Sequence, residues 1–164
     1  MPHGGAERTK VSNVDHTEDW HSYEFEILRK EVVSIGPRIT TPSSLAEYFY
    51  ASQLTSLGEC LWVAIVNGRN DLIGVNQVYK GTSTGTSVNI SEILRPVIAL
   101  GGVGFVLVHN HPSGDHIPSD EDLKLTKDVL SSAKMMDLQM LDHLVIGDNA
   151  FSSVRASTSN EWSW

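Results

Sequence analysis

The sequence predicts an α/β or α+β domain in which helices cover a mixed β-sheet. Short apolar runs typical of strands alternate with segments whose apolar residues recur at helical spacing. The chain has 164 residues, and its hydrophobic content of 40% is enough for one domain with its own core. We expect a flexible tail over residues 1–22, one domain over residues 23–155 and a frayed tail over residues 156–164.

The first half of the chain predicts a strand, a helix and a hairpin. Apolar and acidic side chains alternate imperfectly over residues 23–28, which favours a strand that Pro37 ends. Residues 40–54 open with threonine and proline and then place apolar side chains at helical spacing, so a helix is expected. The apolar run 59–66 is separated from the extended segment 72–81 by a turn-rich string, which predicts a hairpin of two core strands.

The second half continues the alternation after a loop rich in glycine, serine and threonine over residues 81–90. Residues 119–136 place apolar side chains on one face and Asp, Lys and Ser on the other, which predicts an amphipathic helix. The other expected elements are a helix over 91–100, bent or started near Pro96, and strands over 103–110, 138–147 and 150–154.

Charge and cysteine content restrict the classes of partner and the compartment. The formal net charge is -8, and no run of Lys and Arg offsets it, so any contact with DNA is expected to be weak or indirect. The single cysteine, Cys60, excludes an internal disulfide and a cysteine-based metal centre and favours a reducing cytoplasm. The first twenty residues lack an apolar core, and no later run approaches membrane-spanning length, so neither secretion nor membrane insertion is expected.

The stretch HNHPSGDHIPSDED, residues 109–122, is the candidate site. His109 and His111 end a predicted strand and are two residues apart, so both imidazoles should leave the strand on one side and Asn110 on the other. Two convergent imidazole nitrogens can begin a metal site. The alternative is an ordinary polar loop, in which two histidines are more often solvated or hydrogen-bonded than ligating.

The start of the following helix adds a carboxylate to this pair. Ser119 is placed as the N-cap, and Asp122 follows at the third helical position. A capping box alone would stabilise the helix by about 1 kcal/mol and imply no chemistry. If Asp122 also faces the histidines, the set of two histidines and one carboxylate leaves a fourth position for water, as in catalytic zinc sites. Zinc in such a site lowers the pKa of its bound water to near 7.

Activation of water also needs a proton acceptor that does not bind the metal. Glu59 stands just before an apolar strand, where an acidic residue is usually only a contact with solvent. Asp115 and His116 are further candidates, although both fit better as turn residues. The adjacent letters His-Asn-His do not indicate an HNH nuclease, because the three residues of that motif are dispersed through a hairpin and a helix.

The pattern HxHPxxxxxxSxxD that begins at His109 resembles the JAMM motif of the JAB1/MPN/Mov34 metalloenzymes. The longer strings HNHPSGD and LDHLVIGD, with the upstream segment GTSTGTSVNISEILRP, are similar to the bacterial RadC branch of this family. The resemblance covers roughly residues 38–154. It implies the cytidine-deaminase-like three-layer sandwich of the MPN/JAB domain, an α/β fold with a mixed sheet flanked by helices.

The resemblance also implies a role for each residue of the site. His109, His111 and Asp122 would bind one Zn²⁺ ion, with water in the fourth place. Ser119 would form hydrogen bonds around the metal and help to stabilise the oxyanion, and Glu59 would act as the general acid/base.

The expected function is that of a zinc-dependent metallohydrolase that cleaves a peptide or isopeptide bond, with a role linked to DNA repair or mobile-element maintenance. The partner would then be a protein or peptide substrate, and the sequence sets no oligomeric state. Full-length RadC proteins carry an N-terminal helix-hairpin-helix region, for which the residues before Pro37 have no room, so the catalytic-type domain alone is expected. Two alternatives remain open: a non-catalytic zinc-binding module of a repair or recombination complex, and a metal-dependent nuclease.

Overall fold

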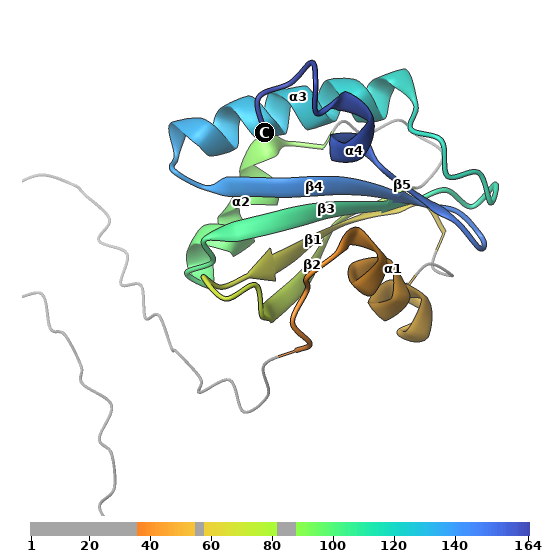
Figure 1. Cartoon of the computed structure of the whole chain (residues 1–164), viewed down its shortest axis with the longest axis horizontal. Coiled ribbons are helices and arrows are strands. Elements are labelled where there is room, and N and C mark those ends of the chain that lie inside the picture. Colours follow the sequence, from red (N-terminus) through yellow and green to blue (C-terminus); the bar gives the residue numbers. More distant parts are fainter. Residues whose placement is uncertain (1–35, 55–57, 82–87) are drawn as a thin grey trace, which may run out of the picture. The chain divides into compact units, whose positions relative to one another are not determined.

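The computed structural model describes residues 36–54, 58–81 and 88–164 (Figure 1). The strand predicted over residues 23–28 and most of the predicted loop over residues 81–90 lie outside these ranges. Within the ranges the elements follow in the order α1 (Pro42–Ala51), β1 (Cys60–Val66), β2 (Leu72–Lys80), α2 (Ile90–Ala99), β3 (Gly104–Asn110), α3 (Asp120–Met135), β4 (Gln139–Ile146), β5 (Phe151–Ser153) and α4 (Val154–Thr158).

The five strands form one mixed sheet in the order β2-β1-β3-β4-β5. The pairs β1–β2, β1–β3 and β4–β5 are antiparallel, whereas β3 and β4 run parallel with α3 as the crossover between them. This confirms the predicted α/β fold class. The parallel pair brings the ends of β3 and β4 to the same edge of the sheet, on the right in Figure 1, where the loops that follow them also lie.

Helices cover both faces of the sheet, because the side chains of its central strands alternate between two apolar cores. Even-numbered side chains of β1 pack with Leu45 and Phe49 of α1. Odd-numbered side chains of the same strand pack with Ile93 of α2 and Val129 of α3. Every residue of β1 is buried. The result is a three-layer sandwich in which the odd-numbered side chains of β3 face α3.

The helices begin close to where their capping residues predict. Thr41 caps α1 by accepting a hydrogen bond from the backbone N–H of Ser44, and Pro42 occupies the first helical position. Pro96 lies inside α2, so it neither starts nor ends that helix.

Among the helices of the described residues, none combines the length and the apolar character that crossing a membrane requires.

The residues from 156 onward, for which the sequence predicts a frayed tail, include the end of a short helix and contact the core. Residues 154–158 form the short helix α4, and the Trp164 indole N–H donates to the Thr158 hydroxyl at 3.1 Å. Trp162 packs against the core on the α2 and α3 side, and the Lys127 ammonium lies 5.0 Å from the centre of its ring. This segment, which has no helical or strand period of its own, is thus held by contacts with α3 and by contacts within itself.

Candidate metal centre

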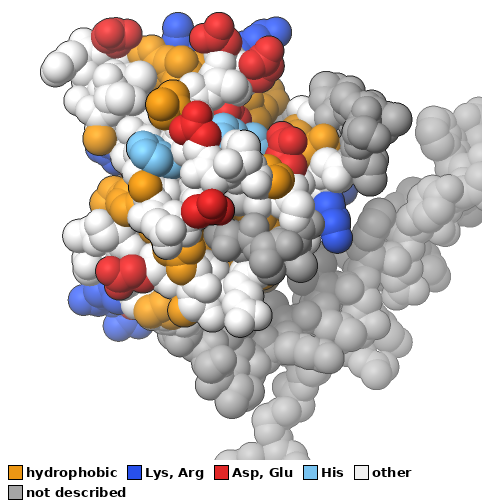
Figure 2. All heavy atoms as spheres, turned by 90° about the vertical axis from the view of Figure 1, so that its right-hand side faces the viewer, with side chains coloured by type: hydrophobic (Ala, Val, Ile, Leu, Met, Phe, Trp, Pro, Cys, Tyr) orange, Lys and Arg blue, Asp and Glu red, His pale blue; other side chains and the backbone are white. Residues whose placement is uncertain are grey.

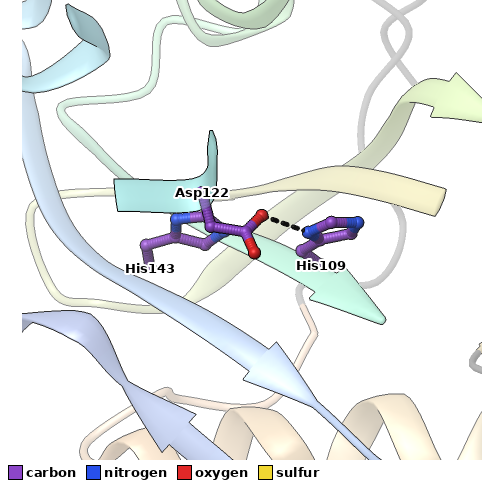
Figure 3. A group of neighbouring side chains, drawn as sticks. All are labelled: His109, Asp122 and His143. Carbon is purple, nitrogen blue, oxygen red and sulfur yellow. Dashed lines mark hydrogen bonds and ion pairs between the residues drawn. The ribbon is translucent and has the colours of Figure 1, made fainter. Parts of the chain in front are cut away.

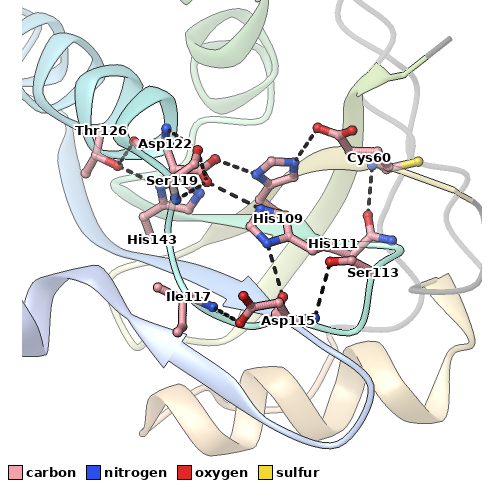
Figure 4. Close-up of polar contacts among 12 residues, drawn as sticks. Cys60, His109, His111, Ser113, Asp115, Ile117, Ser119, Asp122, Thr126 and His143 are labelled. Atoms are coloured by element: carbon pink, nitrogen blue, oxygen red, sulfur yellow. Dashed lines mark hydrogen bonds and ion pairs between the residues drawn. The ribbon is translucent and has the colours of Figure 1, made fainter. Parts of the chain in front are cut away.

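The candidate site lies where the end of β3, the start of β1 and the first turn of α3 meet (Figure 4). His109 and His111 point to the α3 side of the sheet (Figure 4). Asn110 stands between them and, by the alternation of side chains along β3, belongs to the other face, as the spacing predicts. The antiparallel register pairs Cys60 with Asn110, so Glu59, one residue earlier, comes beside the two histidines. Figure 2 shows histidine and acidic side chains close together on this face of the molecule.

Ser119 and Asp122 form the capping box that the sequence predicts at the start of α3. The Ser119 hydroxyl oxygen accepts from the Asp122 backbone N–H at 3.1 Å. In return, Oδ2 of Asp122 accepts from the backbone N–H of Ser119 at 2.8 Å and from its hydroxyl at 2.7 Å. The cap fixes a carboxylate that is only 5% exposed and directs it toward the histidines.

The structure brings together all five residues that the sequence proposes for the site. The His109 Nδ1–H donates to Asp122 Oδ1 at 2.6 Å, and His111 Nε2 lies 3.4 Å from Asp122 Oδ2. On the other side of the His109 ring, Nε2 lies 3.3 Å from Oε1 of Glu59, whose side chain is 52% exposed. Ser119 joins the group through its bonds to Asp122. A buried carboxylate and a solvent-facing one thus flank the same imidazole.

The Asp122 carboxyl group is held in its ionised form. Burial alone would raise its pKa, but the hydrogen bond and the charge of His109, with the two hydrogen bonds from Ser119, hold the pKa well below its ordinary value. A carboxylate that stays charged down to low pH can act as a ligand for a cation at neutral pH.

The loop after β3 sets the proton position on His111. Its Nδ1 lies 3.1 Å from the Asp115 carbonyl oxygen, which can only accept, so Nδ1 carries the proton and Nε2 presents an electron pair when the ring is neutral. Gly114 shapes this turn with a φ of 83°, and its backbone N–H donates to the His111 carbonyl at 3.0 Å. A side chain at Gly147 would collide with the Gly114 carbonyl, so both positions need glycine.

Asp115 and His116 have the turn roles that the sequence favours for them. Oδ1 of Asp115 accepts from the Ile117 backbone N–H at 2.9 Å. His116 Nδ1 lies 2.8 Å from the Ser152 hydroxyl on β5, so its contact ties the loop to the sheet edge.

His143 on β4 is a further member of this cluster, and the motif around His109 does not point to it. The parallel register places it opposite Leu107, so it lies on the same face of the sheet as His109, and it is fully buried. One donor atom each from His109, Asp122 and His143 lie within 4.8 Å of one another. In Figure 3 the Asp122 carboxylate stands between the two rings. A histidine inside the apolar run LDHLVIG is the signal that could have identified it.

Asn110 was also not assigned a role from the sequence. Its Oδ1 accepts from the Cys60 backbone N–H at 2.8 Å, and its Nδ2 donates to the Gly58 carbonyl at 2.7 Å. These two bonds fix the backbone on both sides of Glu59. Asn110, which is buried, therefore positions the candidate acid/base through the main chain.

The residues present fit a zinc ion, since imidazole nitrogen and carboxylate oxygen are its usual ligands besides cysteine. His111 Nε2 and Asp122 Oδ2 are two electron-pair donors 3.4 Å apart, which a proton or a cation between them would hold together. Asp122 lies between the other two predicted ligands and contacts both His109 and His111. His143 adds a third imidazole on the buried side of the site.

The pKa of His143 makes the stability of the metal-free protein depend on pH. Burial lowers this pKa from 6.5 to about 3. Between these values the unfolded chain binds a proton that the folded chain does not, so the free energy of unfolding should fall as pH decreases, by up to about 1.4 kcal/mol per unit. His143→Leu should flatten this dependence in urea unfolding at pH 7 and pH 5 with EDTA. Equal losses in wild type and variant would assign the dependence to another group.

Comparisons with known proteins agree on one family. A family model described as a RadC-like JAB domain matches residues 39–159. A UPF0758 protein of Desulforudis audaxviator is 32% identical over 134 residues, which cover 80% of this chain and 58% of the relative. UPF0758 proteins of Cyanothece sp. and Staphylococcus aureus are 38% and 34% identical, over 79% and 71% of this chain and 51% of each relative. The chain spans about half the length of the curated relatives it matches.

Proposed function

The chain belongs to the family of RadC-like JAB domains, and on this premise we propose that it is a zinc-dependent hydrolase that cleaves a peptide or isopeptide bond. The observation that supports the proposal most is the convergence of His109, His111 and Asp122 beside the exposed carboxylate of Glu59. The names of the relatives specify no reaction, so the substrate class rests on the chemistry of these side chains.

His109, His111 and Asp122 would hold the ion, which when bound would supply a water acidic enough to act as hydroxide near neutral pH and would polarise the substrate carbonyl. Asp122 contributes the negative charge, and Ser119 orients it through two hydrogen bonds. The Asp115 carbonyl keeps His111 in the tautomer that presents Nε2. These side chains are thus oriented by hydrogen bonds within the fold.

Glu59 is proposed to move the proton. Its carboxylate is half exposed, lies 3.3 Å from His109 and is carried by a backbone that Asn110 fixes on both sides. It would take a proton from the attacking water and return it to the leaving amine nitrogen as the amide bond breaks. Ser119 would donate its hydroxyl hydrogen to the oxyanion once that hydrogen turns away from Asp122.

The proposed biological setting is the cytoplasm, in a role connected with DNA repair or mobile elements through a protein partner. The net charge of -8 favours contact with protein over contact with bare duplex DNA. The only cysteine is buried in the core, which is compatible with a reducing compartment.

Metal removal tests the proposal directly. The zinc-loaded chain should hydrolyse members of a panel of fluorogenic peptides and lysine isopeptides, lose this activity on dialysis against EDTA and regain it with one equivalent of Zn²⁺. Hydrolysis that survives removal of the metal would contradict the proposal. Zinc binding without turnover of any amide would favour the accessory module instead, and Mg²⁺-dependent cleavage of duplex or branched DNA would favour the nuclease.

A further inference from the structure

The buried side of the centre carries a nitrogen atom for which the described part of the chain supplies no hydrogen-bond partner. Among the side chains that the structure describes, His143 Nε2 is the one buried polar atom that has no hydrogen-bond partner. Leaving such an atom unpaired in the core destabilises the fold. An ordinary core histidine would satisfy both ring nitrogens, so this atom needs an explanation.

The hydrogen bonds around the ring determine which nitrogen carries the proton. The Thr126 hydroxyl donates its only hydrogen to the Asp122 backbone carbonyl at 2.6 Å. The same hydroxyl oxygen lies 2.7 Å from His143 Nδ1, so Nδ1–H must donate to it. Nε2 therefore presents an electron pair, and the unprotonated nitrogen of a neutral imidazole is a metal-ligating group.

The unpaired atom belongs to a ring in the candidate metal centre. His143 offers a donor atom within 4.8 Å of donor atoms of both His109 and Asp122. The rings of His109 and His143 lie nearly parallel, with 21° between their planes and 6.5 Å between their centres. Figure 4 shows His143 beside the first turn of α3, held there by Thr126. Thr126 thus fixes both the tautomer and the place of the ring.

We propose that His143 is a further ligand of the metal ion, which it contacts through Nε2 from the buried side of the site. The proposal rests on the proposed function, because it takes an ion held by His109 and Asp122 as its starting point. The chain would then offer three imidazoles and one carboxylate, and the water of the proposed reaction would bind as a fifth ligand. His143 would tighten metal binding, and its unsatisfied nitrogen would find its partner only in the metal-loaded protein.

Nitrogen NMR on the whole wild-type chain tests this contact directly. Long-range ¹H–¹⁵N correlation spectra of the histidine rings would be recorded before and after one equivalent of Zn²⁺, with His143→Leu used to assign the His143 signals. We expect the His143 Nε2 signal to move from the position of an unprotonated nitrogen to that of a metal-bound one, while Nδ1 stays protonated. An unchanged His143 Nε2 alongside shifted His109 and His111 signals would overturn the inference and leave the proposed function standing. If no ring nitrogen responds, the proposed function fails as well.

Zinc affinity gives a second, independent measurement. In competition with a chromophoric chelator, His143→Leu should bind Zn²⁺ at least about tenfold more weakly than wild type. Leu144→Val is the matched control, because it changes the opposite face of the same strand and should keep wild-type affinity. Thermal unfolding in EDTA checks that each variant folds. Equal affinity in folded His143→Leu and wild type would show that the ring only packs in the core.

Discussion

Replacing Asp122 by asparagine is expected to lower zinc affinity by more than about 100-fold. The carboxylate is almost completely buried, and its two oxygens face His109 and His111 separately, at 2.6 and 3.4 Å. The amide has similar size but no negative charge, and the loss of a direct ligand should exceed the 10–100-fold cost of altering an outer hydrogen-bond partner. The measurement is zinc content after gel filtration, followed by chelator competition.

Asp120→Asn is the matched control for this variant. It removes the same charge from the same helical turn, but the side chain of Asp120 is exposed. It should retain one zinc ion per chain. Asp122→Asn weakens the cap, which costs about 1 kcal/mol, and also loses the stabilising contact of the ionised carboxylate with His109. Thermal unfolding in EDTA therefore checks that the metal-free variant folds. Wild-type affinity in Asp122→Asn would exclude Asp122 as a ligand.

Much of the fold could be predicted from the sequence, because local patterns and tertiary structure agree over most elements. The buried strand β1 is an unbroken apolar run, and Ser119 with Asp122 marks the start of α3 as a capping box. The C-terminal region could not be predicted in this way. Trp162 and Trp164 make their contacts with α3 and within the segment itself, and no sequence period shows such contacts.

The residues of the site differ in the same way: three of them follow from local sequence patterns, and one follows only from the pairing of strands. The spacing of His109, His111 and Asp122 follows from one strand, one loop and one helix cap, so these residues could be proposed together. His143 enters the cluster only because β4 pairs in parallel with β3 in a register that puts it opposite Leu107. That register is set by packing across the sheet, and a single sequence does not reveal it.

The second large effect is expected at Glu59, where glutamine should lower kcat for amide hydrolysis by about 10²–10⁴-fold while zinc content stays at the wild-type level. Glutamine has the same shape as glutamate, and the bonds from Asn110 to the flanking backbone would still hold it in place. It cannot accept the proton of the attacking water, however. Steady-state kinetics on a substrate that wild type hydrolyses, with zinc analysis of the same samples, provide the measurement.

Two further variants separate this effect from a general loss of charge at the site. Glu92→Gln removes an exposed glutamate at the start of α2 and should leave kcat unchanged. Glu59→Asp keeps the carboxylate on a side chain that is shorter by one methylene, so the kcat of this variant should fall between the values for wild type and for Glu59→Gln. If Glu59→Gln turned over at the wild-type rate, another group would transfer the proton, and if it lost its zinc, Glu59 would be a ligand. Zinc retained without turnover in Glu59→Gln, with zinc lost in Asp122→Asn, would assign proton transfer and metal binding to the two carboxylates that flank His109.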